Sequence, residues 1–168
     1  TAVSITQATE LGRVYGPAEI AALAERAHAR HLLLHMDGAR IANALVTLGC
    51  SPAAITWQAG VDVLSFGATK NGGLAAEAVV FFRPELVRDF ELRRKRAGHL
   101  LSKSRYVSAQ LLAYVAGDVW RRNAEHANAV ARQIGDACGT ALLGTVESNQ
   151  VFVRLGESGK ARLRAEGF

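Results

Sequence analysis

The chain has 168 residues, 49% of them hydrophobic and 21% charged, which is enough to bury a core and excludes a disordered tail. No apolar run approaches the roughly 18 residues of a membrane span and the polar start lacks signal-peptide features, so we expect a soluble, cytoplasmic protein without a membrane partner. The net charge of +5 is concentrated in Arg93–Arg96, continued by Lys103 and Arg105, and without interleaved aromatic residues this run predicts a solvated helix face or subunit contact and no nucleic-acid partner.

The first elements alternate between helix and strand, as in an α/β sheet. Gly16 and Pro17 open a helix that is expected to end near Arg30 or His31, since proline is favoured at the first helical position. The apolar run 32–36 then predicts a parallel strand buried on both faces. This assignment puts Asp37 just beyond the carboxyl end of a strand.

The same pattern repeats downstream. Residues 39–48 predict a helix stopped by Gly49, and residues 61–66 predict the next buried strand. The glycine-bounded segment 67–73 is expected to be a flexible turn that carries Lys70, followed by a strand at 78–82. Ligands of open α/β sheets bind outside the carboxyl ends of the strands, so we expect Asp37 and Lys70 to converge on one crevice.

Longer helical patterns fill the rest of the chain. Helices are predicted over 84–96, over 102–114 and over 118–137, and the last has an apolar side formed by Val119, Ala127, Val130 and Ile134. Residues 150–154 predict a strand of a new layer. Cys50 and Cys138 have neither disulfide nor metal-ligand spacing, so they are expected to be buried and no metal site is predicted.

Lys70 and Asp37 together could serve a pyridoxal cofactor. A lysine amine can form a Schiff base with an aldehyde, and an aspartate can keep a pyridine nitrogen protonated so that the ring accepts electrons. Each residue also has an ordinary interpretation, because most loop lysines are solvated surface residues and most Asp-Gly pairs are turns.

Four segments in order strengthen the first interpretation. They are HMDGARIANA (35–44), SFGATKNG (65–72), EAVVFF (77–82) and RAGHLLSKSR (96–105). Together they resemble the low-specificity L-threonine aldolase family. The resemblance implies an α/β fold: the mostly parallel central sheet of the large domain of a fold type I pyridoxal-phosphate enzyme over 1–116, and a linking helix with the beginning of a small α+β domain over 117–168.

The resemblance also implies the roles of single residues. Lys70 matches the Schiff-base lysine, and Asp37 matches the partner of the pyridine nitrogen of pyridoxal 5′-phosphate. Arg40 matches an arginine near the cofactor and the substrate carboxylate, which a guanidinium can hold through two parallel hydrogen bonds. Thr6 is a weaker cofactor-binding candidate. His35 is expected to be a satisfied residue one step out of phase with Asp37 on its strand, and not a catalytic base.

The implied reaction is the cleavage of L-threonine, L-allo-threonine or a related β-hydroxy-α-amino acid to glycine and an aldehyde, by a homodimer or homotetramer. Lys103 and Arg105 could reach the site of a neighbouring subunit. Relatives extend beyond this chain at both ends, so the 168-residue chain alone is expected to be inactive. Two alternatives stay open: a β-eliminating lyase or other fold type I enzyme, and a non-catalytic assembly module.

Overall fold

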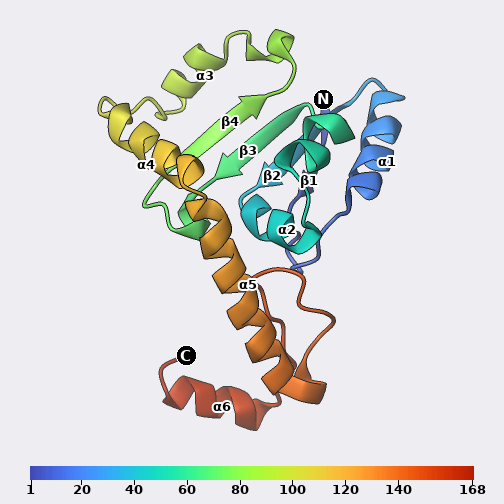
Figure 1. The fold of residues 1–168 in the computed structure, drawn as a ribbon, viewed down its shortest axis with the longest axis vertical. Helices are drawn as coiled ribbons and strands as arrows, with labels where there is room; N and C mark the ends of the chain where they lie inside the picture. The colour runs from blue at the N-terminus through green and yellow to red at the C-terminus, as the bar shows by residue number, and fades with distance from the viewer.

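The computed structural model describes all 168 residues and has a four-stranded sheet as its centre (Figure 1). The strands are β1 (Ala2–Thr6), β2 (Leu33–Gly38), β3 (Val63–Gly67) and β4 (Glu77–Phe81). They lie in the order β1-β2-β3-β4, with β1–β2 and β2–β3 parallel and β3–β4 antiparallel. The predicted α/β class with a mostly parallel sheet is therefore confirmed.

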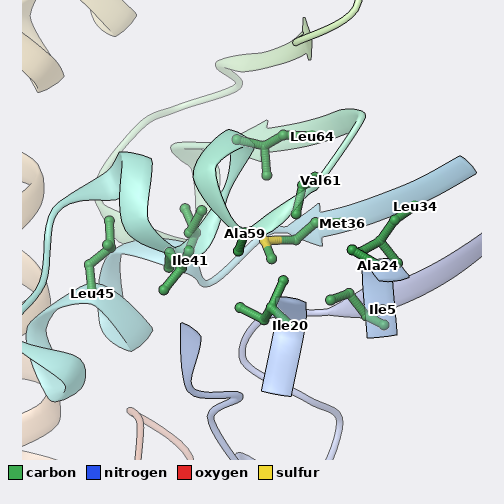
Figure 2. Close-up of a cluster of buried hydrophobic side chains, with 11 residues drawn as sticks. Ile5, Ile20, Ala24, Leu34, Met36, Ile41, Leu45, Ala59, Val61 and Leu64 are labelled. Atoms are coloured by element: carbon green, nitrogen blue, oxygen red, sulfur yellow. The ribbon is translucent and has the colours of Figure 1, made fainter. Parts of the chain in front are cut away.

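Helices cover one face of this sheet and enclose the main core. These elements are α1 (Pro17–His28), α2 (Ile41–Leu48) and the 3₁₀ helices η1 (Pro52–Ile55) and η2 (Trp57–Ala59). Their apolar side chains meet those of the strands in a cluster of 11 buried residues (Figure 2). The cluster consists of Ile5, Ile20, Ala24, Leu34, Met36, Ile41, Leu45, Ile55, Ala59, Val61 and Leu64.

Local signals set the ends of these helices. Pro17 occupies the first turn of α1, and the Glu19 carboxylate accepts a hydrogen bond from the backbone N–H of Gly16 at 2.7 Å, which satisfies a donor that the helix leaves free. Gly49 ends α2 in the left-handed conformation, with φ of 61°, as the sequence predicted.

The predicted single helix over 84–96 is wrong. The structure divides it into a 3₁₀ turn, η4 (Pro84–Val87), and a helix, α3 (Phe90–Arg96), because Asp89 between them has a φ of 60°. A left-handed residue interrupts the helical hydrogen-bond ladder, and aspartate is one of the few non-glycine residues that tolerates this conformation. The basic run Arg93–Arg96 forms the exposed last turn of α3, where positive charge complements the helix dipole.

Two longer helices lead away from the sheet: α4 (Ser104–Ala116) and α5 (Val119–Cys138). Helix α5 packs along α2 and extends past the sheet toward α6 (Glu157–Ala165) (Figure 1). Its buried face consists of Ala124, Asn128, Ala131 and Gly135, whereas Val130 and Ile134 of the predicted apolar side are exposed. Small residues allow a close approach here, since a Cβ on Gly135 would lie 2.6 Å from Val146.

The strand predicted over 150–154 is also wrong in extent. Only Val153 pairs with Leu142, in an isolated antiparallel bridge that is flanked by hydrogen bonds from Leu143 N to Phe152 O and from Arg154 N to Ala141 O, both 2.7 Å long. None of the helices combines the length with the apolar character that crossing a bilayer demands.

Asp62 anchors the other end of the sheet, opposite the carboxyl edge. Its side chain is only 4% exposed and accepts hydrogen bonds from Leu34 N at 2.7 Å, His28 Nε2 at 2.8 Å and Arg83 Nη1 at 3.4 Å. Burial alone would raise the pKa of Asp62, but these hydrogen bonds and the charge of His28 outweigh it and hold the pKa below its ordinary value of 3.8.

This carboxylate makes stability depend on pH. The unfolded chain binds a proton to Asp62 at a higher pH than the folded chain, so its contribution is complete above the ordinary value of 3.8 and is lost as the pH falls through the folded-state pKa. We expect the free energy of unfolding in urea to fall more steeply below pH 4 in the wild type than in Asp62→Asn. Asp136→Asn, at an exposed position of α5, is the matched control and should keep the wild-type slope. Equal slopes in all three proteins would contradict this prediction.

Candidate active site

The carboxyl ends of β1, β2 and β3 bring three polar side chains into one row. Thr6 of β1 pairs with Asp37 of β2, and Asp37 pairs with Ser65 of β3. Asp37 is the penultimate residue of β2, so the prediction that it lies just beyond the strand is wrong by two residues. The difference arises because the ladder to β1 and β3 continues through Asp37 and Gly38.

The Asp37 carboxylate is oriented by its own turn and leaves one oxygen available. Its Oδ1 atom accepts a hydrogen bond from Ala39 N at 2.9 Å, and its backbone oxygen accepts one from Gln7 N at 2.8 Å. No protein group donates to Oδ2. A half-buried carboxylate with one engaged and one free oxygen is suited to accept a hydrogen bond from a protonated nitrogen.

His35 lies on the same face of β2 as Asp37. Side chains alternate along a strand, so residues 35 and 37 point the same way, and the expectation that they are out of phase is wrong. The ring of His35 bridges two neighbouring strands, with Nδ1 2.8 Å from Ser4 Oγ and Nε2 2.9 Å from Ser65 Oγ. Both ring nitrogens are thus hydrogen-bonded, as expected of a satisfied residue.

Lys70 lies on the turn that leaves β3, next to the end of β2. The turn forms a short 3₁₀ helix, η3 (Thr69–Asn71), and Lys70 is exposed on it. It belongs to none of the ion pairs of the structure. Because β2 and β3 are parallel neighbours, the turn of Lys70 and the end of β2 with Asp37 lie at one edge of the sheet. The separation of their functional atoms stays a prediction.

Arg40 and Thr6 lie at the same edge. Arg40 is half-buried and precedes α2, and its Nη1 atom is 3.5 Å from Asn149 Oδ1. Thr6 donates from Oγ1 to Glu10 Oε1 at 3.1 Å. The Arg40 contact lies at the long limit of a hydrogen bond, and the guanidinium keeps its other N–H donors for a ligand.

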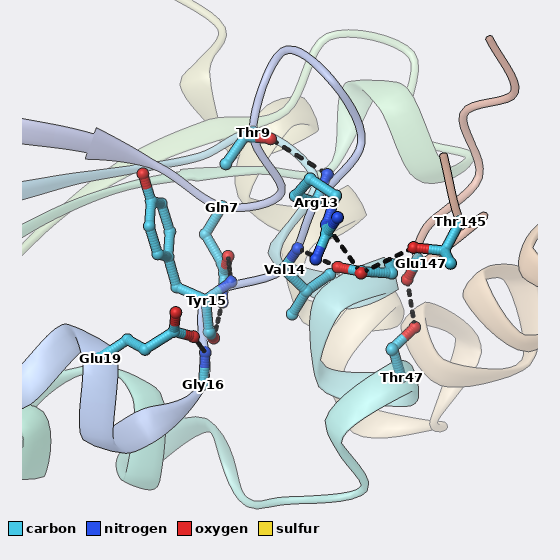
Figure 3. Close-up of polar contacts among 10 residues, drawn as sticks. All are labelled: Gln7, Thr9, Arg13, Val14, Tyr15, Gly16, Glu19, Thr47, Thr145 and Glu147. Carbon is cyan, nitrogen blue, oxygen red and sulfur yellow. Dashed lines mark hydrogen bonds and ion pairs between the residues drawn. The ribbon is translucent and has the colours of Figure 1, made fainter. Parts of the chain in front are cut away.

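The segment after Thr6 is fixed by residues that the sequence did not single out (Figure 3). The buried amide of Gln7 donates to Tyr15 O at 2.9 Å and accepts from Tyr15 N at 3.0 Å. The Glu147 carboxylate accepts from Val14 N at 2.8 Å and pairs with Arg13 at 2.7 Å. The contacts of Glu147 join residues 133 and 134 positions apart, so no local pattern could have revealed them.

Glu147 also ties the C-terminal part of the chain to this edge. Its backbone oxygen accepts from Thr47 Oγ1 on α2. Burial alone would raise the pKa of Glu147, but the hydrogen bonds from Val14 N, Thr145 and Arg13 outweigh it and lower the pKa. A cavity of about 490 Å³ lies beside the Arg13–Glu147 ion pair. It is lined by Thr9, Glu10, Leu11, Arg13, Val14, Tyr15, Glu19 and Glu147.

A second, largely apolar cavity of about 360 Å³ lies on the other side of the sheet. Its lining includes Leu64, Phe66 and Val80, which point to the helical face, away from Ser65 and Asp37. It is therefore separate from the row of polar residues at the carboxyl edge.

Comparison with known proteins finds relatives over nearly the whole chain. Residues 1–158 match the family model described as β-eliminating lyase. The chain is 47% identical over 170 aligned residues to a low-specificity L-threonine aldolase of Pseudomonas aeruginosa, an alignment that covers 99% of this chain. It is 29% identical over 136 residues to a low-specificity L-threonine aldolase of Escherichia coli, covering 80% of this chain. A solved structure of a threonine aldolase from Leishmania major superposes with a TM-score of 0.86 at 27% identity, covering 98% of this chain.

The matches cover much of this chain but only part of each relative. The chain spans 49% of the Pseudomonas aeruginosa protein, 40% of the Escherichia coli protein and 49% of the Leishmania major chain. The family match over residues 1–158 and the superposition on the Leishmania major structure agree with each other. The chain belongs to the β-eliminating lyase family.

Proposed function

We propose that the protein carrying this chain is a pyridoxal-phosphate-dependent aldolase that cleaves L-threonine, L-allo-threonine or a related β-hydroxy-α-amino acid to glycine and an aldehyde. The observation that carries the proposal is the placement of Asp37 and the Lys70 turn at the carboxyl ends of the adjacent parallel strands β2 and β3. The relatives named low-specificity L-threonine aldolase support the same substrate class.

The donor set fits pyridoxal phosphate. Lys70 offers an exposed amine outside any ion pair, which can bond covalently to an aldehyde. The free Oδ2 of Asp37 can accept the hydrogen bond of a protonated pyridine nitrogen. When bound, the cofactor supplies an electron sink for the negative charge left on the substrate after bond cleavage.

The remaining residues of the edge bind and orient in this proposal. The Arg40 guanidinium, which makes only a long contact with Asn149, can grip a carboxylate with two parallel hydrogen bonds. Thr6 pairs with Asp37 in the ladder, so its hydroxyl lies beside the same carboxylate and can line the cofactor site. We assign neither residue a proton-transfer role.

The reaction type decides between this proposal and its nearest alternative. β-Elimination is the second candidate because the matching family model is described as β-eliminating lyase. We expect the native protein that contains this sequence to release glycine and acetaldehyde from L-threonine in equal molar amounts. Release of ammonia and a keto acid instead would identify the lyase, and no product with cofactor present would favour the non-catalytic module.

The proposal extends to organisation, assembly and location. Residues 1–116 would form part of the cofactor-binding large domain and residues 117–168 a linking helix and the beginning of a small domain. A homodimer or homotetramer is supported by large apolar side chains left exposed on α3 and α4, which include Leu92, Tyr106 and Leu112 at 61%, 68% and 71% exposure. A cytoplasmic location is part of the same proposal.

A further inference from the structure

We propose that Asn71 is the positioning residue of the site: its buried amide fixes the turn of Lys70 against α4 and α5 and thereby sets where the Lys70 amine lies. This inference rests on the proposed role of Lys70. It concerns a residue whose side chain hydrogen-bonds to α4 and α5 and is assigned no contact with the reacting atoms.

The side chain of Asn71 connects the turn to two helices. Asn71 is only 8% exposed, whereas its neighbour Lys70 is exposed. Its Nδ2 group donates to the Tyr114 hydroxyl of α4 at 2.6 Å and to the Trp120 backbone oxygen of α5 at 2.8 Å. One amide group therefore uses both of its N–H donors to hold the turn in place.

The backbone of the turn is fixed as well. The backbone oxygen of Asn71 accepts from Asn123 Nδ2 on α5 at 2.9 Å. Gly72 follows with a φ of 105°, and a Cβ at this position would lie 2.6 Å from Asn123 Nδ2. Because only glycine combines this conformation with this approach, Asn123 and Gly72 fit each other closely. The flexible turn that the sequence predicted is in fact anchored on its inner side.

The acceptor on α4 is equally well held. Tyr114 is 5% exposed and packs with Ala68 and Ala76, and its ring centroid lies 6.1 Å from that of Phe66. Burial raises the pKa of Tyr114, although the hydrogen bond from Asn71 opposes this effect. The hydroxyl is therefore neutral at ordinary pH, and it accepts the hydrogen bond from Asn71 while the ring stays rigidly packed.

These contacts bear on Lys70 because its own side chain makes no hydrogen bond or ion pair; besides Asn71, only the 3.3 Å hydrogen bond from Thr69 N to Glu77 Oε1 ties the residues of η3 to another side chain. Its exposed side chain has no ion-pair partner, so the position of the amine follows from where the turn places its Cα. A misplacement of about 1 Å can reduce a reaction on the order of a hundredfold. Loss of the Asn71 anchor should therefore reduce the rate at which the Lys70 amine reacts with an aldehyde, while the protein stays folded.

The test uses the other lysines as internal references. The native protein that contains this sequence is incubated with pyridoxal 5′-phosphate and reduced with borohydride, and the label on Lys70 is compared by peptide mass spectrometry with that on Lys95, Lys103 and Lys160. We expect the wild type to label Lys70 preferentially. Asn71→Ala should reduce the ratio of label on Lys70 to label on the other lysines, by up to about a hundredfold if the amine moves by about 1 Å.

Asn128→Ala is the matched control, because it also deletes a buried asparagine amide that connects α5 to the sheet domain. Asn128 is fully buried and exchanges hydrogen bonds with Asn43 of α2, at 2.9 and 3.0 Å, and it forms no hydrogen bond with the turn of Lys70. We expect this variant to lose thermal stability as Asn71→Ala does, yet to keep the wild-type preference for Lys70. If the role of Asn71 were purely structural, the two substitutions would change the share of label on Lys70 equally.

Each outcome either supports or overturns the positioning role of Asn71. Asn71→Ala with the wild-type preference, or an equal loss of preference in Asn128→Ala, would overturn the inference while leaving the role of Lys70 intact. If Asn71→Ala does not fold, Tyr114→Phe decides, since it removes one acceptor and keeps the packing: a reduced Lys70 share supports the anchor and an unchanged share overturns it. Label spread evenly over the four lysines of the wild type would overturn both this inference and the proposed function.

Discussion

Replacing Lys70 by alanine is expected to abolish aldol cleavage while leaving the fold intact. Lys70 offers a lysine amine on the turn after β3, whereas the polar row of Thr6, Asp37 and Ser65 has no amine that could form a Schiff base with the cofactor's aldehyde. Its side chain is exposed and outside any ion pair, so its removal should cost less than about 0.5 kcal/mol of stability.

The measurement compares acetaldehyde release from L-threonine with the urea midpoint of the same preparations. Lys95→Ala is the matched control, because it removes a lysine from the exposed last turn of α3 and should leave both readouts unchanged. Retained cleavage in Lys70→Ala would remove Lys70 from its role. A collapsed urea midpoint would show that the turn needs the lysine for folding.

Asp37→Asn is expected to reduce turnover on the order of a hundredfold or more with little change in stability. Asparagine keeps an oxygen that can accept the hydrogen bond from Ala39 N, so the turn after β2 should survive. The substitution removes the negative charge that would keep a pyridine nitrogen protonated, and lost electrostatic stabilisation of this kind typically costs factors of that size.

The rate with saturating substrate, measured at several cofactor concentrations, separates weaker cofactor binding from slower chemistry. Asp136→Asn makes the same chemical change at an exposed position of α5 and should be active as the wild type. An unchanged rate in Asp37→Asn at saturating cofactor would mean that another group partners the ring nitrogen. A recovered rate in Asp37→Glu would instead support the need for a carboxylate.

Lys70 and Asn71 lie on one turn, and they differ in what the sequence and the tertiary structure each reveal about them. Lys70 could be selected from the sequence, since its glycine-bounded segment follows a buried strand and resembles a family motif. Asn71 could not, because its meaning depends on Tyr114, Trp120 and Asn123, which lie 43 to 52 positions away along the chain. The sequence accordingly predicted a flexible turn where the structure has an anchored one.

Short-range physics determined most of the elements. Short apolar runs identified the buried strands, Pro17 and Gly49 marked helix ends through their backbone geometry, and the succession of strands predicted the α/β sheet and its ligand-binding edge. Such signals are legible in the sequence because each depends on neighbours within one or two turns of chain.

The tertiary structure alone decided which surfaces meet. Helix α5 buries its small-residue face around Asn128 instead of its more apolar face, because that face approaches α2 and exchanges two hydrogen bonds with Asn43. The tertiary structure also broke the helix at Asp89 and extended β2 through Asp37. These features are stabilised by contacts between residues that are distant in the sequence. Such contacts form only when the chain folds.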